Sequence, residues 1–89
     1  MSTKTKNKEQ KIPKWFKGQI YEEGAKVRNP FSGETYELNA LELSLYDFII
    51  GSQMVFGQFQ ATDKQIKDFD KALYWFRVNN PEAYMVLLD

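Results

Sequence analysis

The sequence predicts a small α+β domain: an N-terminal β-hairpin, followed by two main helices and a short C-terminal helix. Three observations predict this fold. Alternating apolar and polar residues flank a strong turn signal at residues 29–34, the pattern of a hairpin. Two later stretches each begin with a helix-capping pattern and continue with apolar residues at helical spacing. An apolar segment that begins with a proline then ends the sequence.

Residues 1–11 are predicted to form a disordered basic arm, because they contain no large apolar residue. Residues 1–17 hold six Lys and one Glu, a net charge of +5, and the rest of the chain carries −5. An acidic body with a basic arm is therefore expected. The arm could bind nucleic acid or another polyanion. The alternative is a terminus that only aids solubility or folds back on the acidic body.

Residues 12–89 are predicted to form a single domain. Trp15 and Phe16 are large enough to anchor the chain to the body, although an exposed pair that stacks on bases is the alternative. The hairpin is expected over residues 27–38, with Gly33 supplying a positive φ in its turn. A third short strand over residues 19–21 is left open. Phe31 lies in the turn, either exposed as a contact residue or tucked under its own turn.

The central helix is expected over residues 39–57, with Asn39 as N-cap and Glu42 completing a capping box. Its two opposite faces are both apolar, whereas a small domain needs only one apolar face to close its core. The second face therefore requires a partner, which could be another element of this chain or a second copy. The first face comprises Leu41, Leu45, Phe48, Ile49 and Ser52, and the second comprises Leu43, Tyr46, Ile50 and Met54.

A second helix is expected from Thr62, with Gln65 completing its capping box. Its apolar stripe is Ile66, Phe69, Leu73 and Phe76. Phe48 and Phe69, each in the middle of its helix's stripe, are predicted to be core residues. The helix should end near residues 79–80, one of which would be a left-handed C-cap. The last helix, residues 81–88, would take Asn80 as its cap and dock on the body.

The composition argues against an enzyme. The chain has no Cys and no His, which removes disulfides, thiolate nucleophiles, imidazole bases and the usual zinc ligands. Carboxylates are present, at Glu42, Asp47, Asp68 and Asp70, but no metal-binding or phosphate-binding spacing accompanies them. We therefore expect no catalytic residues, no metal and no cofactor. Charged and polar residues interrupt the apolar run at 41–59, so no membrane association is expected, and the lack of Cys favours a cytoplasmic location.

Two runs of the sequence carry a resemblance: NPFSGETYELNALELSLYDFI at 29–49 and WFRVNNPEAYMVLLD at 75–89. Together they resemble small uncharacterised proteins of tailed bacteriophages, over roughly residues 27–89. The resemblance implies a virus-encoded accessory protein in the host cytoplasm that binds a host or phage component. It implies no active site.

The functional prediction is a small non-enzymatic protein-interaction module that forms a homodimer and binds a host or phage protein. The alternative is a nucleic-acid-binding accessory protein that uses the basic arm. The acidic body argues against that alternative, because phosphate binding needs a basic face. The candidate interaction surface consists of Leu43, Tyr46, Ile50, Met54 and Phe31.

Overall fold

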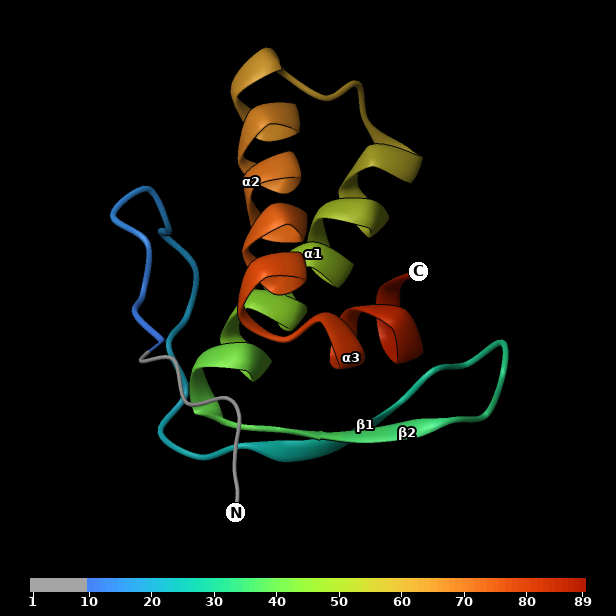
Figure 1. The fold of residues 1–89 in the computed structure, drawn as a ribbon. Helices are drawn as coiled ribbons and strands as arrows, with labels where there is room; N and C mark the ends of the chain where they lie inside the picture. Colours follow the sequence, from blue (N-terminus) through green and yellow to red (C-terminus); the bar gives the residue numbers. More distant parts are fainter. Residues whose placement is uncertain (1–9) are drawn as a thin grey trace.

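A computed structural model describes residues 10–89 and confirms the α+β order. The helices α1 and α2 pack against each other on one side of the two-stranded hairpin, and the short C-terminal helices lie between them and the hairpin (Figure 1). Residues 1–9 of the predicted basic arm lie outside the described residues. The elements are β1 (Ala25–Arg28), β2 (Thr35–Leu38), α1 (Ala40–Gln58), α2 (Asp63–Asn79), α3 (Pro81–Ala83) and η1, a π-helical turn at Tyr84–Leu88.

The hairpin pairs β1 with β2 in antiparallel register, with Ala25 opposite Leu38 and Arg28 opposite Thr35. Gly33 adopts a φ of 81°, the left-handed conformation that the turn requires and that glycine adopts without strain. Gly24 lies so close to the end of β2 that a Cβ there would collide with the carbonyl oxygen of Leu38. Glycine at these two positions therefore lets the chain turn tightly and enter the hairpin.

The third strand left open at residues 19–21 does not form. Instead, the backbone N–H of Tyr21 donates to Ser44 Oγ at 2.9 Å, and its hydroxyl donates to Asp47 Oδ2 at 2.8 Å. Both acceptors lie on α1. The segment is thus held by side chains of a helix, and its N–H at Tyr21 is not free to extend the sheet.

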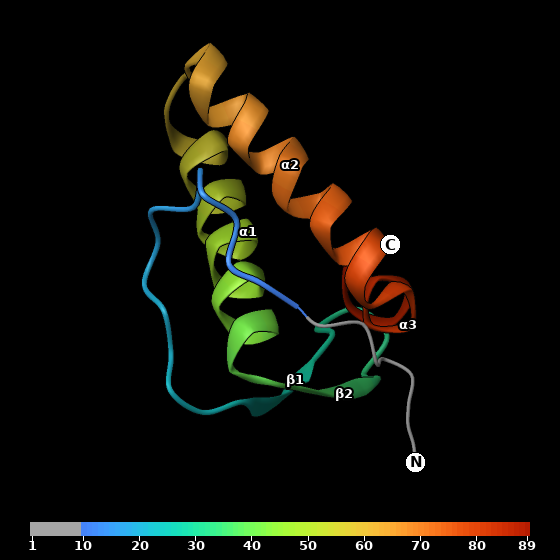
Figure 2. The ribbon, with the colours of Figure 1, turned by 60° about the vertical axis from the view of Figure 1, so that its left-hand side comes forward.

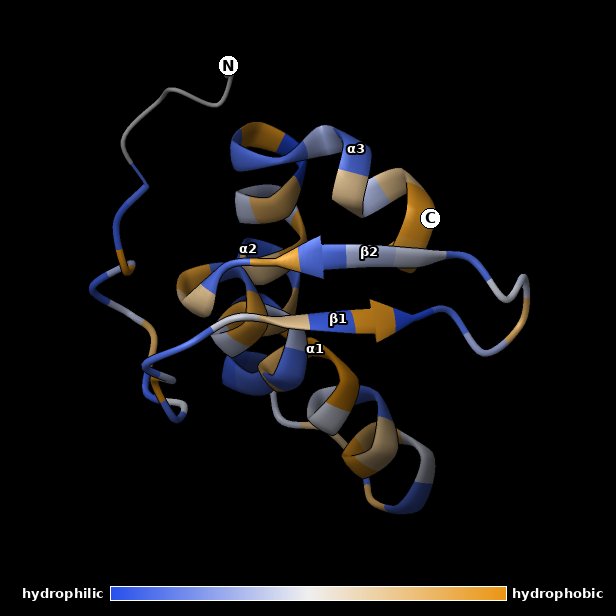
Figure 3. Cartoon of the chain, turned by 90° about the horizontal axis from the view of Figure 1, so that it is seen from below, coloured by the Kyte–Doolittle hydropathy of each residue, from blue (hydrophilic) through white to orange (hydrophobic). Residues whose placement is uncertain are grey.

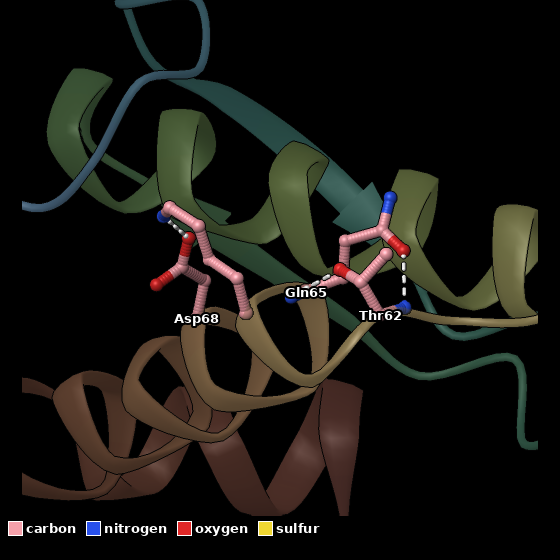
Figure 4. Close-up of polar contacts among 4 residues, drawn as sticks. Thr62, Gln65 and Asp68 are labelled. Carbon is pink, nitrogen blue, oxygen red and sulfur yellow. Dashed lines mark hydrogen bonds and ion pairs between the residues drawn. The ribbon is translucent and has the colours of Figure 1, made fainter.

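Both predicted capping boxes are present. The Asn39 side chain accepts the N–H of Glu42, whose side chain reaches back to the N–H of Asn39. The Thr62 side chain accepts the N–H of Gln65, whose side chain reaches back to the N–H of Thr62 (Figure 4). The left-handed C-cap predicted at 79–80 is wrong. Asn79 is still helical and Asn80 has a φ of −155°. Asn80 instead starts α3, as predicted, by accepting the N–H of Ala83 at 3.1 Å.

The core is centred on Leu45 and Ile49 of α1 and on Phe76 of α2, all of them fully buried. Phe48 and Phe69, the predicted core residues, are half-buried and pack against this core, whose centre is formed by other members of the same predicted stripes. Ile66, at the start of the predicted stripe, is exposed. The buried residues of α2 are Ala72, Trp75 and Phe76, and Trp75 contacts the N-terminal segment through the carbonyl oxygen of Lys11. The remaining buried apolar residues are Phe16, Leu38, Ala72, Trp75, Ala83 and Leu87.

The N-terminal segment is anchored, as the sequence predicts. Phe16 is buried, and its ring lies 5.5 Å from that of Phe48 in an edge-to-face arrangement. Trp15 packs against the same ring at 5.9 Å. The segment, drawn in blue, passes alongside the helix pair (Figure 2). Lys11, although assigned to the arm, is also held, because its carbonyl oxygen accepts the indole N–H of Trp75 at 3.2 Å.

Candidate functional site

The hairpin tip, residues 29–34, is fixed by the side chain of Asn29. Its Oδ1 accepts the backbone N–H groups of Phe31 at 2.8 Å and Ser32 at 3.3 Å, a local turn typical of asparagine. Its Nδ2 donates to the carbonyl oxygen of Val86 at 2.9 Å. The backbone of Asn29 also pairs with Gly33 and Glu34. The tip is therefore held both within itself and to the C-terminal turn η1.

Phe31 lies on this tip with 97% of its surface exposed. The alternative of a ring tucked under its own turn is thereby ruled out. The hairpin end extends beyond the helices in two views of the molecule (Figures 1 and 3). An aromatic side chain that contributes no packing, on a backbone that is held in place, has the geometry of a contact residue.

The other four candidate residues lie on α1 and are covered to different degrees. Leu43 and Tyr46 are half-buried and pack against the core. Ile50 is half-buried, and Met54 is 63% exposed. Local elements thus cover much of the second apolar face, and the packing argument for a dimer rests on Ile50 and Met54. The dimer stays a prediction.

A groove that the sequence did not reveal lies between α1, the start of α2 and residues 18–19. We call it the acid-rimmed groove. Its volume is about 430 Å³. It could have been suspected from the polar and small residues that interrupt the α1 stripe, Ser44, Gly51 and Ser52. Its lining residues are Gly18, Gln19, Ser44, Asp47, Phe48, Gly51, Ser52, Val55, Phe56, Gln65 and Asp68.

A second groove, of about 370 Å³, lies on the outer face of α2, where the N-terminal segment crosses it. Trp15, Tyr74 and Trp75 contribute aromatic surface to it. The indole N–H of Trp75 is already donated to Lys11, and the groove carries one acid and one base, Asp70 and Lys71. Its charges therefore favour neither an anionic nor a cationic ligand.

Glu42 is the one charged side chain that is buried among residues 10–89, with 3% of its surface exposed. Its Oε1 accepts the N–H of Asn39 at 2.9 Å, and its Oε2 accepts the side-chain amides of Gln10 and Asn80, each at 2.8 Å. Asn80 also accepts the hydroxyl of Tyr36 at 3.3 Å. We call Gln10, Tyr36, Asn39, Glu42 and Asn80 the polar junction. It joins the N-terminal segment, β2, α1 and α3, and its carboxylate is fully engaged in structure.

Three tyrosines have raised pKa values. Hydrogen bonding to Asp47 raises the pKa of Tyr21, with smaller contributions from burial and from the charge of Asp47. Burial, followed by the charge of Glu82, raises the pKa of Tyr36. Burial, followed by the charge of Asp47, raises the pKa of Tyr46. None of these tyrosines is thereby activated as a base or nucleophile at neutral pH, because each shift favours the neutral phenol.

Within residues 10–89, no three side chains of the His, Cys, Asp or Glu types come together in a way that could hold a metal ion. No helix in that range has both the length and the apolar content to cross a membrane. The predicted nucleic-acid contact depends on an arm of which residues 1–9 are not described, so it stays a prediction.

Comparison of the chain with family models, with curated proteins and with solved structures gives no match.

Proposed function

We propose that this protein is a small non-enzymatic interaction module that binds another protein through the tip of its hairpin. The observation that carries this proposal is the 97% exposure of Phe31 on a hydrogen-bonded turn. Phe31 would insert into an apolar pocket of the partner.

The energetics favour such a contact. Burying a phenylalanine side chain contributes about 1.5–3 kcal/mol. Because Asn29 already fixes the backbone on either side of the ring, little conformational entropy is lost when the tip docks. Aromatic residues on a fixed backbone are the usual anchors of small interfaces. Flanking polar residues of the tip, Ser32 and Glu34, would form the rim of such a contact.

The resemblance to small bacteriophage proteins suggests the class of partner. We propose a host or phage protein that the module meets in the host cytoplasm. A membrane or nucleic-acid partner is not proposed for the tip. Strong binding to a membrane or to nucleic acid requires a cluster of Lys or Arg, and the tip has a single aromatic ring without such a cluster.

The test is site-specific photocrosslinking in cells. A photoreactive phenylalanine analogue is placed at position 31 and, as a matched control, at Phe59, which is 66% exposed at the end of α1. We expect one partner to be crosslinked from position 31 and not from position 59. Phe31→Ser should abolish recovery of that partner by affinity capture while Phe59→Ser does not. Recovery of the same proteins from both positions would contradict the proposal.

We also propose that the second face of α1 supports a twofold dimer, through Ile50 and Met54 beside Leu43 and Tyr46. Closed twofold pairs are the commonest oligomers, and exposed apolar patches are commonly interaction sites. Sedimentation equilibrium of the wild type should give twice the chain mass of 10.5 kDa, and Ile50→Glu should give a folded monomer. A wild-type mass of one chain at high concentration would rule out the dimer.

A further inference from the structure

We infer that the acid-rimmed groove is a second docking site, which binds a basic amphipathic segment of a partner protein, with apolar side chains on the groove floor and Arg or Lys at its rim. The site shares no residue with the hairpin tip, so it goes beyond the proposed contact of Phe31.

The groove has the shape of a site for an elongated ligand. Its α1 lining follows one stripe from Ser44 to Phe56 at helical spacing. Twelve residues of helix rise roughly 18 Å, which is the length of about three helical turns of a bound peptide. A groove of this length beside two helices suits the mode in which an amphipathic helix lies along an apolar surface.

The floor of the groove is apolar and open. Phe48, Val55 and Phe56 contribute its apolar surface. At Gly51 the absent Cβ would have no neighbouring atom within 4 Å, so the middle of the floor lacks a side chain and faces free space. Its volume of about 430 Å³ falls in the range of binding sites that take apolar groups.

The residues that line the groove include two acids and no base, although Lys64 lies beside one of the acids. The two acids are Asp47 of α1 and Asp68 of α2. Asp47 accepts the hydroxyl of Tyr21, and Asp68 is paired with Lys64 at 2.7 Å. Each bond uses the Oδ2 atom, and the Oδ1 atoms accept no side-chain hydrogen bond from residues 10–89. A cationic group can therefore bind either rim carboxylate without first breaking its contact.

The neutral polar residues of the groove do not favour a different ligand. The hydroxyls of Ser44 and Ser52 donate to helix carbonyls at 2.8 Å each. Gln65 is engaged in the capping box of α2 (Figure 4). The groups left to a ligand are thus the Oδ1 atoms of the rim acids, the exposed amide of Gln19 and the apolar floor, and a segment that is basic and apolar complements the rim and the floor.

The probe is a fluorescein-labelled 14-residue amphipathic peptide of Leu, Ala and Arg, measured by fluorescence anisotropy with the full chain. One twin has Glu in place of Arg and another has Ser in place of Leu. We expect the Arg–Leu peptide to bind at least about tenfold more tightly than either twin. Raising the salt concentration should weaken its binding, because Asp47 is exposed to solvent. Phe31→Ser should not change its affinity, which separates this site from the hairpin tip.

Two glycines of α1 provide a matched pair of variants. Gly51 lies in the groove, whereas Gly57 does not, and neither has an atom within 4 Å of its absent Cβ. Gly51→Phe fills the floor and should lower the peptide affinity at least about tenfold, whereas Gly57→Phe should leave it within about twofold. The double variant Asp47→Asn with Asp68→Asn should remove the preference for Arg over Glu.

Three results would overturn the inference: equal affinity for the Arg and Glu peptides, unchanged affinity in Gly51→Phe, or equally tight binding of free arginine amide, which would indicate a site for a small cation. Self-association of the wild type that Gly51→Phe abolishes would assign the groove to a second copy instead. If Gly51→Phe does not fold, amide shifts of the wild-type protein decide the outcome. They must change at residues 51, 52 and 55 when the Arg–Leu peptide is added, and changes confined to other residues would refute the site.

Discussion

Two asparagines, Asn29 at the hairpin tip and Asn80 between α2 and α3, use their side chains in the same way. Each accepts backbone N–H groups that follow it in the chain, and each donates its amide to a distant acceptor. Asn80 is buried, and its acceptor is the carboxylate of Glu42. Asn29 is partly exposed, and its acceptor is the carbonyl of Val86.

The free energy lost when these hydrogen bonds break differs, because Asn80 is buried and Asn29 is partly exposed. At the polar junction, a lost hydrogen bond leaves polar groups buried without water, which is costly. At the tip, water can replace most lost bonds, so the arrangement contributes little stability and mainly fixes the position of Phe31. The same side-chain chemistry thus stabilises the fold in one region and holds an exposed aromatic residue in place in the other.

Glu42→Ala should have the largest effect, because it leaves the donors of Gln10, Asn39 and Asn80 without an acceptor. We expect a loss of about 3 kcal/mol in the free energy of unfolding, measured by urea denaturation. Glu37→Ala, an exposed acid on β2, is the control and should change stability by less than about 0.5 kcal/mol. A loss at Glu42 as small as that of the control would show that water satisfies the junction.

Asn80→Ala should lower the unfolding free energy by about 2 kcal/mol, since it removes both the cap of α3 and one donor to Glu42. The neighbouring Asn79 is a matched control, because its side chain donates only to the carbonyl of Trp75 within the same helix. Asn79→Ala should cost clearly less. Equal losses at the two positions would contradict the assignment of Asn80 to the junction.

Asn29→Ala should cost about 1 kcal/mol, because water can reach the groups that it frees. Measuring Asn29→Ala and Asn80→Ala in one series of urea denaturations therefore compares the stability contributed by the hairpin tip with that contributed by the polar junction. A loss at Asn29 larger than that at Asn80 would reverse the comparison and show that the tip, through Val86, holds the C-terminal turn in place.

Of these changes, alkaline pH should have the smallest effect on stability. It acts on the polar junction by deprotonating the hydroxyl of Tyr36. Its pKa is raised in the folded state, by burial and by Glu82, above the ordinary value of 10.0. Its contribution to stability is therefore fully present below about pH 10 and is lost as the pH rises through the folded-state pKa. Tyr36→Phe should make the alkaline loss shallower in thermal melts from pH 8 to about pH 11. Tyr74→Phe, at an exposed ring, should not change it.

Local features of the fold were predictable because the contacts that specify them span few residues. Both helix starts follow from capping boxes that join positions three residues apart, and the hairpin follows from the turn at 29–34. Asn80 as the cap of the last helix was predictable for the same reason. Whether Phe31 is exposed or tucked under its own turn could not be predicted, because the sequence of a turn does not specify the direction of an aromatic side chain within it.

Interactions between near neighbours along the chain specify the order of the elements, their caps and the turn. The distant partners of each element depend on how the whole chain packs. Tyr21 bonds to Ser44, 23 residues away, instead of forming a strand, and Glu42 meets Asn80, 38 residues away, and becomes a buried junction as well as a cap. Packing likewise buries Phe76 completely and leaves Phe48 and Phe69 partly exposed. Helical periodicity defines an apolar face but not the part of it that neighbouring elements cover, because packing between elements fixes that choice.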